Sequence, residues 1–183
     1  MDYALFQAIN NLAGHSSLLD NLMILIAKYG PVFFALPLLL IWFRGDNSAK
    51  RGALLSLLSM GIAMLIGQVI TRVYDRPRPF TVHHVNQLIA HGADASFPSD
   101  HTLFSFGIAG VVLLVNHRWG VVSLLFACLV AFSRVFVGVH YPGDVIGGAG
   151  IGLAVGVLLW QVRRIFRPIM DFLIGIAARL KLA

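Results

Sequence analysis

The sequence has little charge, only one cysteine and no glutamate. Of its 183 residues, 12% are charged and 58% are hydrophobic, and the eight acidic residues are all aspartate. So little charge excludes an ordinary soluble domain and indicates an integral membrane protein. A single cysteine excludes an internal disulfide, and the apolar neighbours of Cys128 predict a small buried side chain. The scarcity of carboxylates also argues against a hydrolytic site that holds two metal ions.

A formal net charge of +6 raises the alternative of a nucleic-acid-binding protein. The basic residues gather at the ends of hydrophobic segments, however, so no nucleic-acid partner is expected. The first residues, MDYALF, have neither the basic stretch nor the small-residue cleavage site of a signal peptide. We therefore expect no cleaved signal peptide.

Five hydrophobic segments approach the roughly 20 residues that a helix needs to cross the membrane. The expected spans are residues 22–43, 52–73, 102–115, 119–139 and 145–162. The third is short, and the first is predicted to bend at Gly30-Pro31. Prolines and a glycine exclude one continuous helix in the polar stretch between the second and third spans. The sequence predicts an all-α, polytopic membrane helical bundle with about five spans, forming a single domain over residues 1–183.

Both terminal segments carry apolar residues on one helical face. Near the N-terminus these are Leu5, Phe6, Ile9 and Leu12. Near the C-terminus they recur at spacings of three and four, at Phe166, Ile169, Met170, Leu173, Ile174, Ala177 and Leu180. Arginines flank the second group. We expect amphipathic terminal helices, the second of them lying on an anionic membrane surface.

The fourteen basic residues are divided unequally between the two ends of the predicted bundle. Nine lie at one end: Arg44, Lys50, Arg51, Arg118, Arg163, Arg164, Arg167, Arg179 and Lys181. Five lie at the other: Lys28, Arg72, Arg76, Arg78 and Arg134. By the positive-inside rule the richer end faces the cytoplasm. A multi-pass protein of a bacterial cell (inner) membrane is expected, with a cytoplasmic C-terminus and the 74–101 stretch outside.

Three polar clusters fall at the poorer, outer end. They are RVYDRPRP (72–79), FPSDH (97–101) and SRVFVGVHYPGD (133–144). A charged residue at the centre of a spanning helix costs about 2.5–3.5 kcal/mol on insertion scales, so ionisable groups in or beside spans generally mark a functional site. Because successive spans alternate in direction, all three clusters should meet on one face of the membrane.

The residue types in these clusters suit an anionic group. Arg78 and Arg134 offer planar guanidinium forks that match phosphate. Ser99 follows Pro98 at a predicted helix start, where free N–H groups and the positive end of the helix dipole favour an anion. The sequence therefore predicts a phosphate-binding site.

Two histidines and an aspartate complete the pattern. Of His101 and His140, one can attack phosphorus while the other protonates a leaving group. Asp144, four residues after His140, can accept a hydrogen bond from one imidazole nitrogen and leave the other nucleophilic. A metal site is disfavoured, since this end has no HExxH spacing and only four carboxylates, those of Asp75, Asp94, Asp100 and Asp144. No metal or cofactor is expected.

The clusters resemble the signature of the type 2 phosphatidic acid phosphatase superfamily, the membrane relatives of the vanadium haloperoxidases. That signature is K-x6-RP, then PSGH, then SR-x5-H-x3-D. The third motif is complete here as Ser133, Arg134, His140 and Asp144, the second appears as PSDH at 98–101, and the first ends in Arg78-Pro79. The resemblance covers residues 22–162.

Two positions depart from the signature. Thr71 stands where the family has lysine, and Arg72 and Arg76 are the candidates for the missing charge. Asp100 replaces the family glycine, and we expect it to support the phosphate site from beside it.

The resemblance implies phosphoryl transfer through a phosphohistidine. His140 attacks, Asp144 orients it and His101 protonates the leaving oxygen, while Arg78, Ser99 and Arg134 hold the phosphate. The short chain and DRPRPF are most similar to bacterial undecaprenyl-diphosphate phosphatases of the bacitracin-resistance type. A polyprenyl diphosphate lipid substrate is thereby implied, and with it the recycling of the cell-wall carrier lipid. Two alternatives stay open: a broader phosphatidate or phosphatidylglycerophosphate phosphatase, and a non-enzymatic lipid or anion transporter.

Glycines recur every four residues in the last predicted span, at Gly148, Gly152 and Gly156. This spacing predicts a close approach to a neighbouring helix. Such an approach would help to hold Asp144 beside His140.

Overall fold

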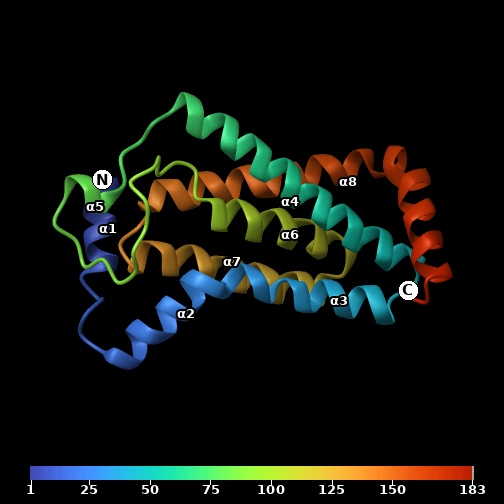
Figure 1. The fold of residues 1–183 in the computed structure, drawn as a ribbon, viewed down its shortest axis with the longest axis horizontal. Coiled ribbons are helices and arrows are strands. Elements are labelled where there is room, and N and C mark those ends of the chain that lie inside the picture. The colour runs from blue at the N-terminus through green and yellow to red at the C-terminus, as the bar shows by residue number, and fades with distance from the viewer. Residues whose placement is uncertain (183) are drawn as a thin grey trace.

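The computed structural model describes residues 1–182, which contain eight helices and no strand. The helices are α1 (Asp2–Asn10), α2 (Ser17–Phe33), α3 (Ala35–Arg44), α4 (Asn47–Val73), α5 (Pro79–Val82), α6 (Asp100–Val115), α7 (His117–Phe136) and α8 (Pro142–Arg179). Figure 1 shows α1, α5 and the loop before α6 gathered at one end of an elongated bundle. The last turns of α8 lie at the other end. The predicted all-helical bundle is confirmed.

Four helical stretches are long and apolar enough to cross a membrane: Ser17–Arg44, Asn47–Val73, His117–Phe136 and Pro142–Arg179. The first is interrupted at Phe34, shortly after the helix-internal Pro31, and Figure 1 shows α2 inclined to α3. A bend near Gly30-Pro31 is therefore confirmed. The predicted third span, α6, is apolar but has only 16 residues, or about 24 Å at 1.5 Å per residue.

The short helix α6 lies inside the bundle and packs against α4, α7 and α8. Ten of its residues are buried. A Cβ on Gly152 would lie 2.8 Å from the backbone nitrogen of Gly107, and one on Gly148 would lie 3.0 Å from the carbonyl oxygen of Ser99. The predicted close approach of α8 is thus confirmed, with α6 as the partner. It places the second turn of α8 against Ser99, the residue that precedes α6.

The N-terminal helix packs differently from its predicted apolar face. Phe6 and Asn10 are buried, whereas Leu5 and Leu12 are each 51% exposed. Phe6 joins a cluster with Val135 from the end of α7. The face of α1 that packs on the bundle therefore contains Phe6 from the predicted apolar face and the polar residue Asn10, but not Leu5.

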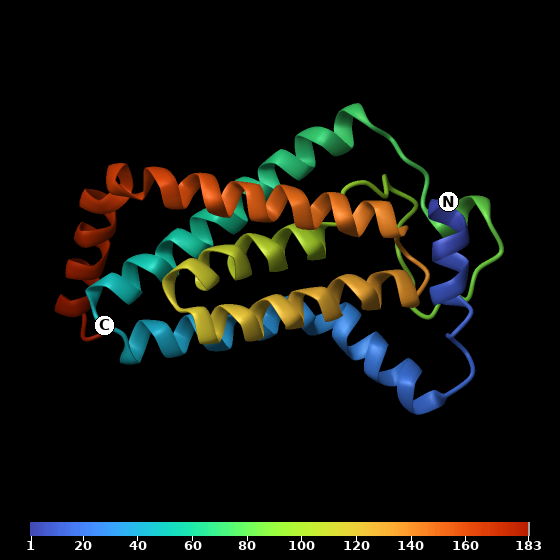
Figure 2. The ribbon, with the colours of Figure 1, turned by 180° about the vertical axis from the view of Figure 1, so that it is seen from behind.

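The C-terminal segment is part of α8 and not a separate helix. Pro168 lies within α8, and Figure 2 shows the last turns of this helix bending across the end of the bundle. Met170 and Ile174 are buried there, while Ile169 and Leu173 are exposed. The predicted apolar stripe is thus divided: Met170 and Ile174 pack on the bundle, and Ile169 and Leu173 face outward.

The prediction that Cys128 is buried is wrong. Its side chain is exposed on α7, between the buried residues Ala127 and Val130. A membrane helix keeps apolar residues on its lipid-facing side as well as its packed side. An apolar run therefore does not reveal which of its residues are buried.

Candidate active site

His140 lies in the short connection between α7 and α8, at the end of the bundle where α1 is found. Gly138 turns the chain there with φ of +85°, a conformation that side-chain-bearing residues rarely adopt. A Cβ on Gly138 would also lie 2.8 Å from the carbonyl oxygen of Asn86. The tight turn directs His140 back between the helix ends, where it is 2% exposed.

Two partners determine the tautomer of His140. Nδ1 lies 2.9 Å from the carbonyl oxygen of Ser96, which can only accept a hydrogen bond, so Nδ1 carries the hydrogen. Nε2 lies 3.1 Å from Nη1 of Arg78, which can only donate. The lone pair therefore resides on Nε2. Burial lowers the pKa of His140 to about 4, so the ring is neutral at physiological pH.

Asp144 lies beside His140 but does not bond it directly. Its Oδ2 is 3.6 Å from Nδ1 of the imidazole, too long for a hydrogen bond. The same oxygen accepts hydrogen bonds from the hydroxyl of Ser96 and from the backbone N–H of Tyr141 at 2.8 Å. The predicted direct contact is therefore replaced by an indirect one. Asp144 fixes Ser96, and the carbonyl of Ser96 holds the imidazole.

Arg78 is buried at 4% exposure and donates from all three of its nitrogens. Nε bonds Asp94, Nη2 bonds the carbonyl of Ala95 at 3.2 Å, and Nη1 bonds the carbonyl of Val139 at 3.0 Å as well as facing His140. A guanidinium has five N–H groups. One N–H on Nη2 is not used by these contacts. A second N–H, on Nη1, would become available to an anion if His140 moved away from it.

Arg134 is the other buried arginine, at 2% exposure in the last turn of α7. Nη1 donates to the carbonyl oxygen of Ala27 in α2 at 2.8 Å. Pro31, four residues after Ala27, has no N–H with which to bond that carbonyl. Nε of Arg134 is buried and has no hydrogen-bond partner among the described residues. A buried donor of this kind is costly unless a ligand or water satisfies it.

The start of α6 supplies three further residues. Ser99 is fully buried and precedes the helix, but its hydroxyl does not cap the first turn; it accepts instead from the hydroxyl of Thr102 at 3.1 Å. His101 is partly exposed and close enough to Arg134 for the guanidinium charge to act on it. The side chain of Asp100 is exposed and forms no hydrogen bond or ion pair with the other residues that the structure describes. The free N–H groups of this helix start face the same end of the bundle as His140.

Comparison with known proteins assigns the chain to a family. A family model described as the PAP2 superfamily matches residues 52–167. The chain belongs to the PAP2 superfamily. It is 39% identical over 176 residues to undecaprenyl-diphosphatase BcrC of Bacillus subtilis (strain 168), covering 96% of this chain and 91% of the relative.

Two further matches agree with this membership. The chain is 34% identical over 149 residues to bacitracin transport permease protein BcrC of Bacillus licheniformis, covering 81% of this chain and 73% of the relative. The crystal structure of Aquifex aeolicus LpxE superimposes with a TM-score of 0.72 at 29% identity, covering 87% of this chain and 94% of that one. The PAP2 fold therefore extends over most of the chain.

The two candidates for the missing PAP2 lysine, Arg72 and Arg76, lie in different surroundings. Arg72 is exposed, and Thr71 bonds the carbonyls of Gly67 and Phe97. Arg76 instead forms an ion pair with Asp144 at 2.7 Å. Arg76 therefore supports Asp144, which in turn holds the hydroxyl of Ser96. This contact does not bring Arg76 to Nε2 of His140.

Sequence reasoning missed the N-terminal support of this PAP2 site. Asp2 in α1 pairs with Arg76 at 2.5 Å and accepts a hydrogen bond from the N–H of Gly143 at 2.8 Å. Arg76 also stacks over the ring of Tyr141, 4.3 Å from its centroid. Asp2 and Asp144 are 142 positions apart, so no local pattern marks the connection.

Sequence reasoning also gave no role to His91. Its ring centroid lies 6.3 Å from that of His140, and its Nδ1 is 3.5 Å from Asp94. Burial acts to raise the pKa of Asp94, but the hydrogen bond and positive charge of Arg78 lower it overall. Among residues 1–182 no three His, Cys, Asp or Glu side chains form a group suited to a metal ion.

Proposed function

We propose that this PAP2 protein is a membrane phosphatase that hydrolyses undecaprenyl diphosphate to undecaprenyl phosphate and inorganic phosphate. The observation that carries the proposal is the fixed tautomer of His140, which leaves Nε2 unprotonated against the buried Arg78, while the charge of the buried Arg134 also acts on the ring. A neutral imidazole is a nucleophile for phosphorus once the substrate phosphate takes over the N–H of Arg78 that faces its lone pair. The substrate class follows from undecaprenyl-diphosphatase BcrC, which shares 39% identity over nearly the whole chain.

In the first step, Nε2 of His140 attacks the terminal phosphorus of the diphosphate. The bond from that phosphorus to the bridging oxygen breaks, and undecaprenyl phosphate departs with the bond's electron pair. His101 donates a proton to the bridging oxygen as it leaves. Nε of Arg134, the spare N–H of Arg78 and the hydroxyl of Ser99 hold the terminal phosphate oxygens, where they stabilise the charge of the transition state.

In the second step, water attacks the phosphorus of the phosphohistidine. The nitrogen–phosphorus bond breaks, the electron pair returns to Nε2, and inorganic phosphate is released. His101, now deprotonated, accepts the proton from the attacking water. Ser96 keeps Nδ1 protonated through both steps, so Nε2 is the atom that bonds phosphorus and then gives it up.

The proposal is tested by measuring phosphate release from undecaprenyl diphosphate with purified protein in detergent. We expect His140→Ala to abolish turnover and to prevent acid-labile incorporation of ³²P from labelled substrate. His84→Ala is the matched control, because His84 is an exposed histidine at the same end of the molecule. Near-normal turnover by the folded His140→Ala protein would contradict the mechanism.

The same assay separates the alternatives. Comparable turnover of phosphatidate or phosphatidylglycerophosphate would identify a broader lipid phosphatase. The similarity to bacitracin transport permease protein BcrC keeps a transporter as a second candidate. A transporter needs an anion site but no oriented nucleophile, so binding of the diphosphate without phosphate release would favour it.

We also propose that the His140 site faces the outside of a bacterial cell membrane. The support is the nine-to-five division of basic residues between the two ends. A cysteine at Ala93, exposed near the site, should react with an impermeant thiol reagent on intact cells in a Cys128→Ser background. A cysteine at His117, exposed at the other end, should react only after lysis. The opposite pattern would reverse the orientation.

A further inference from the structure

A polar cavity lies at the end of the bundle opposite His140. It has a volume of about 270 Å³ and is formed where the start of α4, the end of α6 and the C-terminal part of α8 meet. It is lined by Ser48, Arg51, Gly52, Leu55, Val115, Trp160, Arg163, Arg164, Arg167 and Met170. Nothing in the proposed phosphatase reaction uses these residues.

The cavity is strongly basic. Four of its ten lining residues are arginines and none is acidic. Among the described residues, the acidic side chain that pairs with these arginines is Asp171, which lies 2.6 Å from Arg51 and 3.6 Å from Arg167. Four positive charges and one negative charge leave a formal excess of three. The charge around this space is therefore not neutralised by the described residues.

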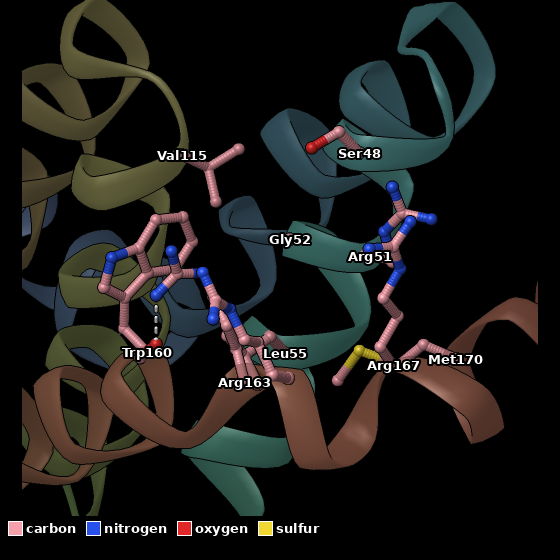
Figure 3. A pocket seen from close by; sticks show the side chains of 10 residues that line it. Ser48, Arg51, Gly52, Leu55, Val115, Trp160, Arg163, Arg167 and Met170 are labelled. Carbon is pink, nitrogen blue, oxygen red and sulfur yellow. Dashed lines mark hydrogen bonds between the residues drawn. The ribbon is translucent and has the colours of Figure 1, made fainter.

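Two contacts hold Arg163 against Trp160 at the edge of the cavity. Nη1 of Arg163 donates to the carbonyl of Trp160 at 2.6 Å, and the guanidinium lies 4.2 Å from the centroid of its ring. Figure 3 shows Trp160 and Arg163 on one side of the cavity and Arg51 and Arg167 on the other, with Gly52 between them. Planar guanidinium groups placed on two sides of one space suit the oxygens of a phosphate.

The cavity also lies at the depth of lipid headgroups. About 22 residues of α8 separate Pro142, beside the His140 site, from Arg163. At 1.5 Å per residue this is roughly 30 Å, the thickness of the hydrocarbon core. Trp160 marks the interface, where tryptophan is enriched. Leu55, Val115 and Met170 supply an apolar floor next to the arginines.

We propose that this arginine cavity binds a phosphate group, and that the group belongs to the headgroup of an anionic phospholipid in the adjoining leaflet. Basic pockets between membrane helices bind lipid phosphates in this way. The bound phosphate would bridge Arg51 of α4 to the arginines of α8. It would thereby hold the bent end of α8 against the bundle, independently of any reaction at His140.

The test compares lipid binding by the full-length protein and by the double variant Arg163→Gln/Arg164→Gln. Native mass spectrometry in detergent would count bound phosphatidylglycerol or cardiolipin, with phosphatidylcholine, a zwitterionic lipid without net charge, as the competitor. One arginine near an anionic headgroup is worth about 1 kcal/mol, a factor of roughly five. The double variant should therefore bind anionic lipid about thirtyfold less tightly, and its thermal stability should no longer rise on adding that lipid.

The matched control is Arg44→Gln/Arg118→Gln, which removes two exposed arginines from the same end but outside the cavity. This control should keep the lipid binding and stabilisation of the parent protein. Equal losses in both double variants would show diffuse attraction to charge and overturn the site. A cavity-dependent stabilisation by inorganic phosphate alone, matching that by lipid, would overturn the assignment to a headgroup. Arg167→Gln gives a second cavity variant if the first fails to fold.

Discussion

Nη1 of Arg134 donates a 2.8 Å hydrogen bond to the carbonyl oxygen of Ala27, the carbonyl that Pro31 leaves without its helical partner. Proline in a helix interior removes the N–H that would bond the residue four positions earlier. The helix distortion at Pro31 therefore has a direct use at the active site. It provides an acceptor that fixes one side of a buried guanidinium, while Nε stays unpartnered.

We predict that Pro31→Ala lowers kcat/KM about threefold to tenfold while leaving the protein as stable as the parent or more so. The new N–H at position 31 would compete for the carbonyl of Ala27, and the straightened helix would displace it from Arg134. Activity and thermal unfolding would be measured on the same preparation. Pro37→Ala is the control, because Pro37 lies in the first turn of α3. Unchanged activity in Pro31→Ala would show that Arg134 does not depend on this carbonyl.

Ser96 is predicted to be a positioning residue. Its hydroxyl donates to Asp144 and its carbonyl accepts from His140, so loss of the hydroxyl should loosen both. A hydrogen bond to a charged group contributes about 1.5–3 kcal/mol, which corresponds to a loss in kcat of about tenfold to a hundredfold for Ser96→Ala. Ser96→Thr should retain most of the activity.

The pH profile distinguishes this role from simple destabilisation. Without the hydroxyl, Asp144 would interact more strongly with the imidazole and raise its pKa. The acid limb of kcat/KM should therefore move to higher pH in Ser96→Ala. Ser105→Ala is the control, since Ser105 is buried in α6 and its hydroxyl has no partner among the described residues. A uniform loss at all pH values would mean that Ser96 does not act on His140.

The parent protein should remain active well below neutral pH. Burial lowers the pKa of His140 to about 4, and the reacting form is the neutral one. Activity is therefore present above this pKa and lost as the pH falls through about 4, because protonation removes the lone pair on Nε2. The measurement is kcat/KM against pH, which reports groups of the free enzyme. An acid limb near 6.5, the value for an unperturbed histidine, would contradict a buried His140.

Arg76 and Asp2 should differ in importance although they form one ion pair. Asp144 is fully buried, so Arg76→Gln removes the charge partner of a buried carboxylate and should reduce kcat/KM at least tenfold. The side chain of Asp2 is 34% exposed, and Asp2→Asn should cost threefold or less. Arg72→Gln, an exposed neighbour of equal charge, should have little effect. A larger loss in Arg72→Gln than in Arg76→Gln would identify Arg72 as the replacement for the missing lysine.

Much of the fold was predictable from the sequence because the spans are long apolar runs separated by charges and prolines. The clusters containing Arg78, Ser99 and His140 were expected at one end because successive spans alternate in direction. Burial within the spans was not predictable. Lipid is as apolar as a protein interior, so Cys128 on the lipid-facing side of α7 looks like a core residue in the sequence.

The supporting contacts of the site were less visible for a different reason. Ser96 acts partly through its backbone carbonyl, and a pattern of side-chain types does not mark a carbonyl. The Asp2–Arg76 pair joins residues 74 positions apart, which come together only when α1 docks on the bundle. His91 lies in a loop without periodicity, and its approach to His140 depends on that loop's folded path.

The last prediction concerns His101. When the substrate is a diphosphate, the leaving group is a phosphate monoester, whose second pKa is about 6. It departs far more readily than the alkoxide expelled from a lipid monophosphate. General-acid catalysis contributes about 10²- to 10⁴-fold, and less when the leaving group is already weakly basic. His101→Ala should therefore reduce kcat/KM less for undecaprenyl diphosphate than for any lipid monophosphate that the enzyme accepts.

Both substrates would be assayed in the same detergent, after circular dichroism has shown that His101→Ala folds. Asp100→Asn is the control, because Asp100 is the exposed neighbour of His101 at the start of α6 and should affect the two substrates equally. Since His101 also lies near Arg134, it has a second way to act, by binding phosphate. Equal losses on the two substrates would mean that it binds phosphate and is not the acid. A greater loss on the monophosphate would assign the proton transfer to His101.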